Sequence, residues 1–265
     1  MPEGHTIHRL ARDLGRDLAG SRVLATSPQG RFESGAARLD GRVLERTDAA
    51  GKHLFLDFGD DDVLYVHLGL IGKFKRTASD VHRPGAVRLR LEGPERAWHL
   101  SGPQTCRLVD PMEVDQIVGA LGPDPLRRDA DPERFVERAS RSRKAIGALL
   151  LDQDVIAGVG NVYRAEILLL VGVHPARPAK DVHPDTLRQI WELTVELLRI
   201  GVRLNRIVTV TGEDAGFVTP GRLRRADALY AYKRDGKPCR RCDTPISIGK
   251  VANRSIWWCP TCQPD

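Results

Sequence analysis

The sequence predicts an α+β chain in three parts: a β-sandwich or barrel that begins with a helix, a helical region, and a small C-terminal cysteine module. Three observations predict this organisation. Short strand-like runs alternate with Gly and Asp before a Gly-Pro-Asp-Pro breaker at 122–125, and helical periodicity follows the breaker. Four of the five cysteines then lie between residues 239 and 262.

The first part is predicted to contain one helix and several strands. Apolar residues at positions 7, 10, 11, 14 and 18 form one face of a helix over 6–19. The runs that follow are rich in β-branched and aromatic residues, and several alternate between apolar and polar positions, which favours a β-sandwich or barrel. The predicted strands are 22–26, 54–58, 63–68 and 86–91.

The second part has the 3.6-residue periodicity of helices. The predicted helical stretches are 131–139, 142–153, 161–172 and 184–204. Residues 212–228 are rich in Gly and charge, and they are predicted to form a loop or linker before the cysteines.

The sequence predicts a cytosolic protein or, in a eukaryote, a nuclear one. Hydrophobic residues make up 41% and charged residues 29% of the 265 positions. No apolar run approaches the ~18 residues of a membrane span, and the N-terminus lacks the apolar core of a signal peptide. The net charge is +6, and residues 201–265 hold 12 Lys/Arg against 6 Asp/Glu. Clustered cations favour a polyanionic partner, although a solvated basic face would give the same count.

The cysteine spacing predicts one structural zinc ion. Cys239 and Cys242 form one CxxC pair, and Cys259 and Cys262 form a second after sixteen residues. Each pair places two sulfurs at one turn, and four thiolates close a tetrahedron with no position open for water. Two disulfides are the alternative, but they suit a secreted protein and leave Cys106 over.

The segment between the two cysteine pairs is predicted to be a hairpin that presents Arg254. Its alternation directs Ile256 and Trp258, or Trp257, inward. A guanidinium fixed on a metal-bound hairpin suits phosphate, because its planar fork matches two oxygens. An exposed arginine without a ligand is the alternative.

Residues 149–168 are predicted to form a helix end, a Gly-rich turn and a second helix that begins near Asn161. Gly158 and Gly160 permit a close approach of the backbone to a ligand. N–H groups at a helix start favour phosphate, and the amide of Asn161 adds a donor. An ordinary turn between helices is the alternative.

At four separated places the sequence resembles the formamidopyrimidine-DNA glycosylase/endonuclease VIII family. These are Pro2-Glu3-Gly4, Gly51-Lys52-His53-Leu54, the segment 152–166, and the finger segment 236–263. The resemblance implies a bifunctional DNA glycosylase/AP lyase of base excision repair that acts as a monomer on damaged DNA in the bacterial cytoplasm, nucleoid-associated when bound. It also implies three domains: an N-terminal β-sandwich catalytic domain (1–121), a helix–two-turn–helix domain (122–225) and a zinc finger (226–265).

The resemblance assigns catalytic roles to Pro2, Glu3, Lys52 and Arg254. Removal of Met1 would leave Pro2 as a secondary amine, and an α-amino group has a pKa of roughly 7.7–8.0. This amine would form a Schiff base at the sugar C1′, from which the strand is cleaved by β,δ-elimination. Glu3 would transfer protons, Lys52 would supply a cation, and Arg254 would grip a phosphate and assist the second elimination.

The resemblance also assigns DNA contacts to His67, Leu70, Asn161 and Arg254, with Lys73 as a weaker candidate. Leu70 would fill the gap left by an extruded base, whereas a buried core leucine is the alternative. Asn161 and Arg254 would hold phosphates.

Three departures from the purine-excising branch favour oxidised pyrimidines such as thymine glycol. The segment 101–106 lacks the Arg and Phe that this branch carries there, Gly147 stands where a Lys is frequent, and the chain opens PEGHTIHR. The alternatives are a purine-type glycosylase of the same family, a non-catalytic DNA-damage binder, and a zinc-ribbon factor.

Overall fold

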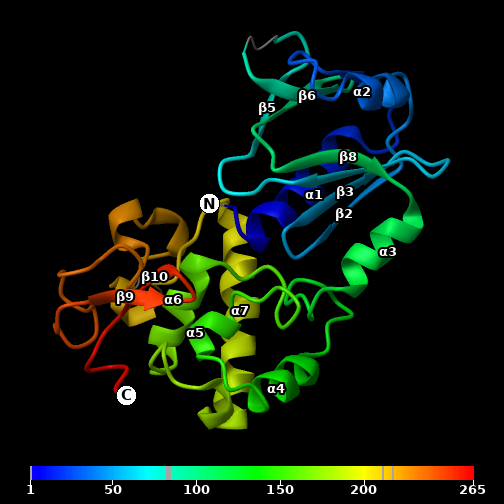
Figure 1. Ribbon diagram of the computed structural model, residues 1–265. Coiled ribbons are helices and arrows are strands. Elements are labelled where there is room, and N and C mark those ends of the chain that lie inside the picture. The colour runs from blue at the N-terminus through cyan, green and yellow to red at the C-terminus, as the bar shows by residue number, and fades with distance from the viewer. Residues whose placement is uncertain (1, 82–84, 211, 217) are drawn as a thin grey trace. The chain divides into compact units, whose positions relative to one another are not determined.

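The computed structural model describes residues 2–81, 85–210, 212–216 and 218–265 (Figure 1). The chain divides into two compact units, Met1–Ala120 and Leu121–Asp265, and each unit is described by itself. The finer division into three domains stays a prediction. Among the described residues, no helix is both long enough and apolar enough to cross a membrane.

The first unit is a β-sandwich with a helix at its start, as the sequence predicts. One antiparallel sheet has the strand order β2-β3-β4-β8, and the other has the order β1-β6-β7-β5. The strands are β1 (Leu24–Thr26), β2 (Arg46–Ala50), β3 (His53–Asp57), β4 (Val63–His67), β5 (Lys73–Ala78), β6 (Val87–Glu92), β7 (Arg96–Ser101) and β8 (Thr105–Val109). The helices are α1 (Gly4–Leu18), α2 (Glu33–Leu39) and α3 (Pro111–Gly119).

One hydrophobic core joins α1 to both sheets. It contains Leu14 from α1, Leu56 and Val66 from the first sheet, and Leu91 and Leu100 from the second. The helix packs closely on β2, because a Cβ at Gly15 would come within 2.7 Å of the hydroxyl oxygen of Thr47. Strands β2, β5, β7 and β8 were not predicted. Three of them are sheet edges, where a polar sequence is tolerated because one side of the strand has no partner.

The second unit is helical and ends in a hairpin. Its helices are α4 (Pro132–Ser140), α5 (Ile146–Leu149), α6 (Asn161–Leu170) and α7 (Pro184–Leu204). The helix predicted over 142–153 is wrong in extent, because only four of its residues are helical. Residues 142–146 instead pair their backbone with 177–180, through bonds such as Ala179 N–H to Lys144 carbonyl at 2.8 Å.

The chain after α7 leads into the cysteine module. The described part of 212–228, which was predicted as a loop, contains the short 3-10 helices η2 (Gly212–Ala215), η3 (Pro220–Arg222) and η4 (Arg225–Asp227). The buried carboxylate of Glu166 on α6 then accepts the N–H groups of Tyr230, Ala231 and Tyr232. This anchor ties the start of the module to α6. The predicted hairpin is present as β9 (Ser247–Val251) and β10 (Arg254–Trp258), with β10 against α6 in Figure 1.

Candidate nucleic-acid interface and metal centre

The N-terminus places a buried acid beside Pro2. Glu3 precedes α1 with extended backbone angles (φ −124°, ψ 178°), and its carbonyl accepts the N–H of Thr6 at 2.9 Å. Its residue is 0% exposed, whereas Pro2 is half-buried. Carboxylates are rarely fully buried away from functional or paired sites. Met1, whose removal is expected, lies outside the described residues.

Lys52 and His67 meet at one end of the first sheet. Lys52 lies in the turn between β2 and β3, and His53 pairs directly with His67 across β3 and β4, with ring centroids 5.2 Å apart. Burial, the neighbouring His67 and the Lys52 ammonium lower the pKa of His53 to about 4. Burial and Lys52 also lower the pKa of His67. Both imidazoles are therefore neutral near pH 7, and Lys52 carries the positive charge of this cluster.

The turn after β4 presents two apolar side chains to solvent. Leu70 is 66% exposed and Ile71 is 81% exposed, so the core interpretation of Leu70 is wrong. The turn closes tightly: Gly72 N–H donates to the Leu68 carbonyl at 3.0 Å, and a Cβ at Gly72 would lie 2.2 Å from that oxygen. Lys73 follows, exposed, at the start of β5. Whether Leu70 enters DNA stays a prediction.

The Gly-rich turn before α6 is buried. Gly158 has φ +88° and needs glycine, whereas Gly160 has φ −130°, which any residue adopts. The side chain of Gln153 organises the turn: it accepts the Gly158 N–H at 3.0 Å and donates to the Val159 carbonyl at 3.0 Å. Asn161 is 8% exposed and donates through Nδ2 to the carbonyl of Ser255 at 3.1 Å. Asn161 therefore contacts the strand that carries Arg254.

Arg254 is exposed at the start of β10. The turn before it has positive φ at both central residues, Ala252 (53°) and Asn253 (57°), which suits a two-residue hairpin and strains the alanine. Beneath this turn lies Arg164 of α6, which is 0% exposed and donates to the carbonyls of Val251, Arg254 and Ser255 at 3.2–3.4 Å. Ile256 and Trp257 are buried, and Trp258 is half-buried.

The four predicted cysteines converge. Their sulfur atoms all lie within 4.8 Å of one another, with Cys242 3.4 Å from both Cys259 and Cys262, and Cys239 3.9 Å from Cys262. All are free thiols, so the disulfide alternative is wrong in this structure. Sulfurs 2.3 Å from a tetrahedral zinc are about 3.8 Å apart. The cluster therefore fits a metal ion of that size, and Cys106 lies outside it.

Three contributors were not anticipated from the sequence. Ile71 is a second exposed apolar side chain next to Leu70, and the two form the apolar tip of this turn. Gln104 donates its backbone N–H to the His67 carbonyl at 2.9 Å, and its side chain raises the pKa of His67 against the lowering by burial and Lys52. Arg164 holds the Arg254 strand from below. An arginine inside the apolar helix pattern of 161–172 was the available signal, because a buried guanidinium requires carbonyl or carboxylate partners.

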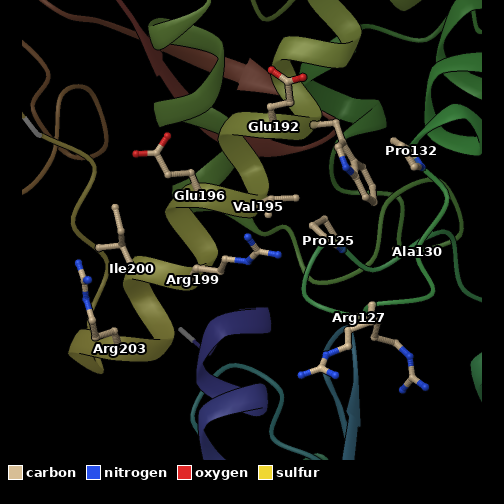
Figure 2. A pocket seen from close by; sticks show the side chains of 12 residues that line it. Pro125, Arg127, Ala130, Pro132, Glu192, Val195, Glu196, Arg199, Ile200 and Arg203 are labelled. Carbon is tan, nitrogen blue, oxygen red and sulfur yellow. The ribbon is translucent and has the colours of Figure 1, made fainter.

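A cavity elsewhere in the second unit contains none of the predicted site residues. It lies between the segment 125–132 and α7 and is lined on α7 by Glu192, Glu196, Arg199 and Arg203. Figure 2 shows these four side chains on α7, with Pro125 and Arg127 on the segment beside the helix. Its charged side chains are two glutamates and two arginines on α7, with Arg127 and Arg128 across from them.

Family models match most of the chain. The formamidopyrimidine-DNA glycosylase N-terminal domain matches residues 1–116, and the formamidopyrimidine-DNA glycosylase H2TH domain matches residues 121–212.

Individual relatives match over the full length. Endonuclease 8 1 of Mycobacterium tuberculosis is 45% identical over 269 residues, covering 99% of this chain and 100% of the relative. Formamidopyrimidine-DNA glycosylase of Herpetosiphon aurantiacus is 31% identical over 281 residues, covering 99% and 100%. A solved complex between the Lactococcus lactis Fpg and a DNA containing an abasic site has a TM-score of 0.82 at 26% identity, covering 99% of this chain and 100% of that one.

Proposed function

The chain belongs to the formamidopyrimidine-DNA glycosylase/endonuclease VIII family of DNA glycosylases with AP lyase activity, and from this premise we propose a mechanism that starts at Pro2. The observation that carries the proposal is the fully buried carboxylate of Glu3, directly after an N-terminal proline. A free amine and an adjacent desolvated acid are what a Schiff-base lyase needs at one place.

The Pro2 nitrogen attacks C1′ and the bond from C1′ to the base breaks, so the base leaves with the electron pair and takes up a proton. Ring opening, with a proton delivered to O4′ by Glu3, leaves an iminium between Pro2 and C1′. The iminium acidifies C2′, so loss of that proton expels the 3′ phosphate. Loss of a C4′ proton then expels the 5′ phosphate, and water releases the sugar fragment from Pro2.

The described residues support DNA contacts in each unit. Lys52 is the cation beside the neutral imidazoles of His53 and His67, which suits a sugar-phosphate group. Leu70 and Ile71 supply the exposed apolar tip for insertion into the base stack. In the second unit, Asn161 lies under the Arg254 strand, and both side chains are proposed to hold phosphates.

We propose oxidised pyrimidines as the preferred lesions. The segment 101–106 offers neither an arginine nor a phenylalanine. Position 147 has no room for a lysine in this backbone, because a Cβ there would come within 2.8 Å of the Pro175 carbonyl oxygen. The relative that is 45% identical is named endonuclease 8, which also favours this branch of the family. A purine-type glycosylase is the second candidate.

We further propose one structural zinc ion on the four cysteines and action as a monomer in the bacterial cytoplasm.

Incision of a small panel of duplexes tests this proposal. Thymine glycol, 8-oxoguanine and abasic duplexes should be compared for wild type and for Glu3→Gln. We expect thymine glycol to be incised faster than 8-oxoguanine, and Glu3→Gln to lower base excision by ~10²-fold or more while leaving DNA binding intact. Faster incision of 8-oxoguanine would favour the purine-type alternative. Binding without incision of any duplex would favour the non-catalytic binder.

A further inference from the structure

The loop between α7 and the cysteine module carries an excess of positive charge that is separate from Arg254. Arg222, Arg224 and Arg225 are all exposed, and three cations thus fall within four residues. The single acid between positions 218 and 232 is Asp227, and it is 3.4 Å from Arg240. No ion pair of the three exposed arginines occurs among the described residues. We name residues 220–229 the arginine loop.

Two other arginines hold the backbone of the arginine loop. Arg206, just after α7, donates from Nη2 to the carbonyls of Pro220, Gly221 and Leu223 at 3.0, 3.1 and 2.7 Å. Arg240, inside the first cysteine pair, donates to the carbonyls of Ala226 and Leu229 at 3.0 and 3.1 Å. Five carbonyls of the loop are therefore fixed by guanidinium groups.

The loop is also anchored by packing. Leu223, between the exposed arginines, packs against the core of the cysteine module, which includes Cys239 and Trp257. The neighbouring acid Asp214 is engaged elsewhere, because it accepts the hydroxyl of Tyr230 at 2.6 Å and lies 3.6 Å from Arg241. The loop backbone thus has a defined conformation while its three cations face solvent.

Adjacent like charges repel, and a rigid backbone prevents them from moving apart. A polyanion relieves this repulsion and gains counterion release. Successive cations along an exposed loop suit the repeated phosphates of a strand. Phosphate contacts of this kind position a nucleic acid without reading its sequence.

We propose that Arg222, Arg224 and Arg225 form a second phosphate-contact site, for the backbone of a nucleic acid strand, separate from Arg254 and held in shape by Arg206 and Arg240. The site rests on the proposed function only in that its ligand is the DNA on which the enzyme acts. Because Arg240 lies between two metal-ligand cysteines, the metal would also support this loop.

The experiment measures the affinity of the zinc-loaded full chain for a duplex with a tetrahydrofuran abasic analogue between 50 and 200 mM chloride. Replacing Arg222, Arg224 and Arg225 by Gln, singly and together, should lower the slope of log K against log salt by about 0.9 per arginine. Between 50 and 200 mM chloride, the affinity of the wild type should therefore fall by a factor about 40-fold larger than that of the triple variant. Its zinc content and thermal midpoint should not change, because the three side chains are exposed.

The matched control removes the same charge elsewhere in the unit, through the triple variant of Arg134, Arg141 and Arg199, all exposed. We expect its slope to stay within one unit of wild type. An unchanged slope in the loop variant, or equal changes in the loop and control variants, would overturn the site and leave a solvated basic face. Wild-type borohydride trapping, run in parallel, tests the proposed lyase separately, since the slopes are measured without catalysis.

Discussion

The guanidinium Nη2 of Arg164 donates to the backbone carbonyl of Arg254 at 3.4 Å, although ninety positions separate the two residues. The same side chain donates to the carbonyl of Gly147 at 2.7 Å, so it ties the start of α5 to the β9–β10 hairpin. The buried guanidinium of Arg164 on α6 therefore fixes the backbone at the start of β10, where the exposed Arg254 lies. Arg254, the residue proposed to bind phosphate, is therefore positioned by Arg164, which need not contact DNA.

Replacing Arg164 by Met should destabilise this unit by about 2–4 kcal/mol, because several carbonyls lose a charged donor in a buried place. Hydrogen exchange of residues 247–258 should rise at the same time. The control is Arg188→Met, which breaks exposed, solvent-screened ion pairs with Glu133 and Asp185 and should lower the stability much less. Equal costs for the two variants would show that Arg164 does not hold the hairpin.

The zinc content of cysteine variants should distinguish the four clustered cysteines from Cys106. Cys259→Ser should lower zinc from one ion per chain to none and weaken DNA binding, since a module this small depends on its metal to fold. Cys106→Ser should keep one zinc, because Cys106 lies on β8 and burial raises its thiol pKa to about 12. Retained zinc in the Cys259 variant, measured by elemental analysis, would show that the ligands are wrong.

The apolar tip should matter for duplex and not for single strands. Leu70→Ala and Ile71→Ala should each lower excision from duplex DNA by about 10-fold or more, because an extruded base leaves a stack that recloses. Excision from single-stranded substrate should change little. Met112→Ala removes another exposed apolar side chain, 73% exposed on α3, and should have no effect on either substrate. Equal losses on both substrates would contradict insertion into the stack.

Stability should depend on pH through buried histidines. The pKa of His53 is about 4 in the folded chain against 6.5 for an ordinary histidine. Between these values the unfolded chain binds a proton that the folded chain does not, so the free energy of unfolding falls as pH drops from 6.5 toward 4. His53→Asn should reduce this acid-dependent fall in the thermal midpoint. An unchanged pH dependence in the variant would assign the effect to other groups, such as the buried His5, whose pKa is also about 4.

Patterns that repeat along the chain predicted the fold well. The α7 helix was predicted with its bounds at Pro184 and Leu204, because a proline starts the helix and the apolar periodicity is long. The cysteine cluster followed from spacing alone. The edge strand β5, with the sequence KFKRTA, gave no alternating signal because none of its side chains is fully buried and three of the six are exposed.

Contacts between distant segments could not be predicted from local pattern. Residues 142–146 pair with 177–180 and do not form a helix. This pairing depends on the tertiary contact that places Pro178 opposite Ala145. The meeting of Lys52 with His53 and His67 depends on the register of β3 and β4. The support of Arg254 by Arg164 depends on the packing of the hairpin on α6. These three relationships are set by tertiary structure, and the chemistry proposed here depends on the last two.

The most direct test of the mechanism is borohydride trapping on a duplex with a natural abasic site. Reduction of the iminium should give a covalent protein–DNA adduct, and mass spectrometry of the digested adduct should place the sugar on the nitrogen of residue 2, with Met1 removed. A variant with an extra residue before Pro2 should give no adduct. An adduct on Lys52 or another internal lysine, or no adduct with an enzyme that still incises, would contradict Pro2 as the nucleophile.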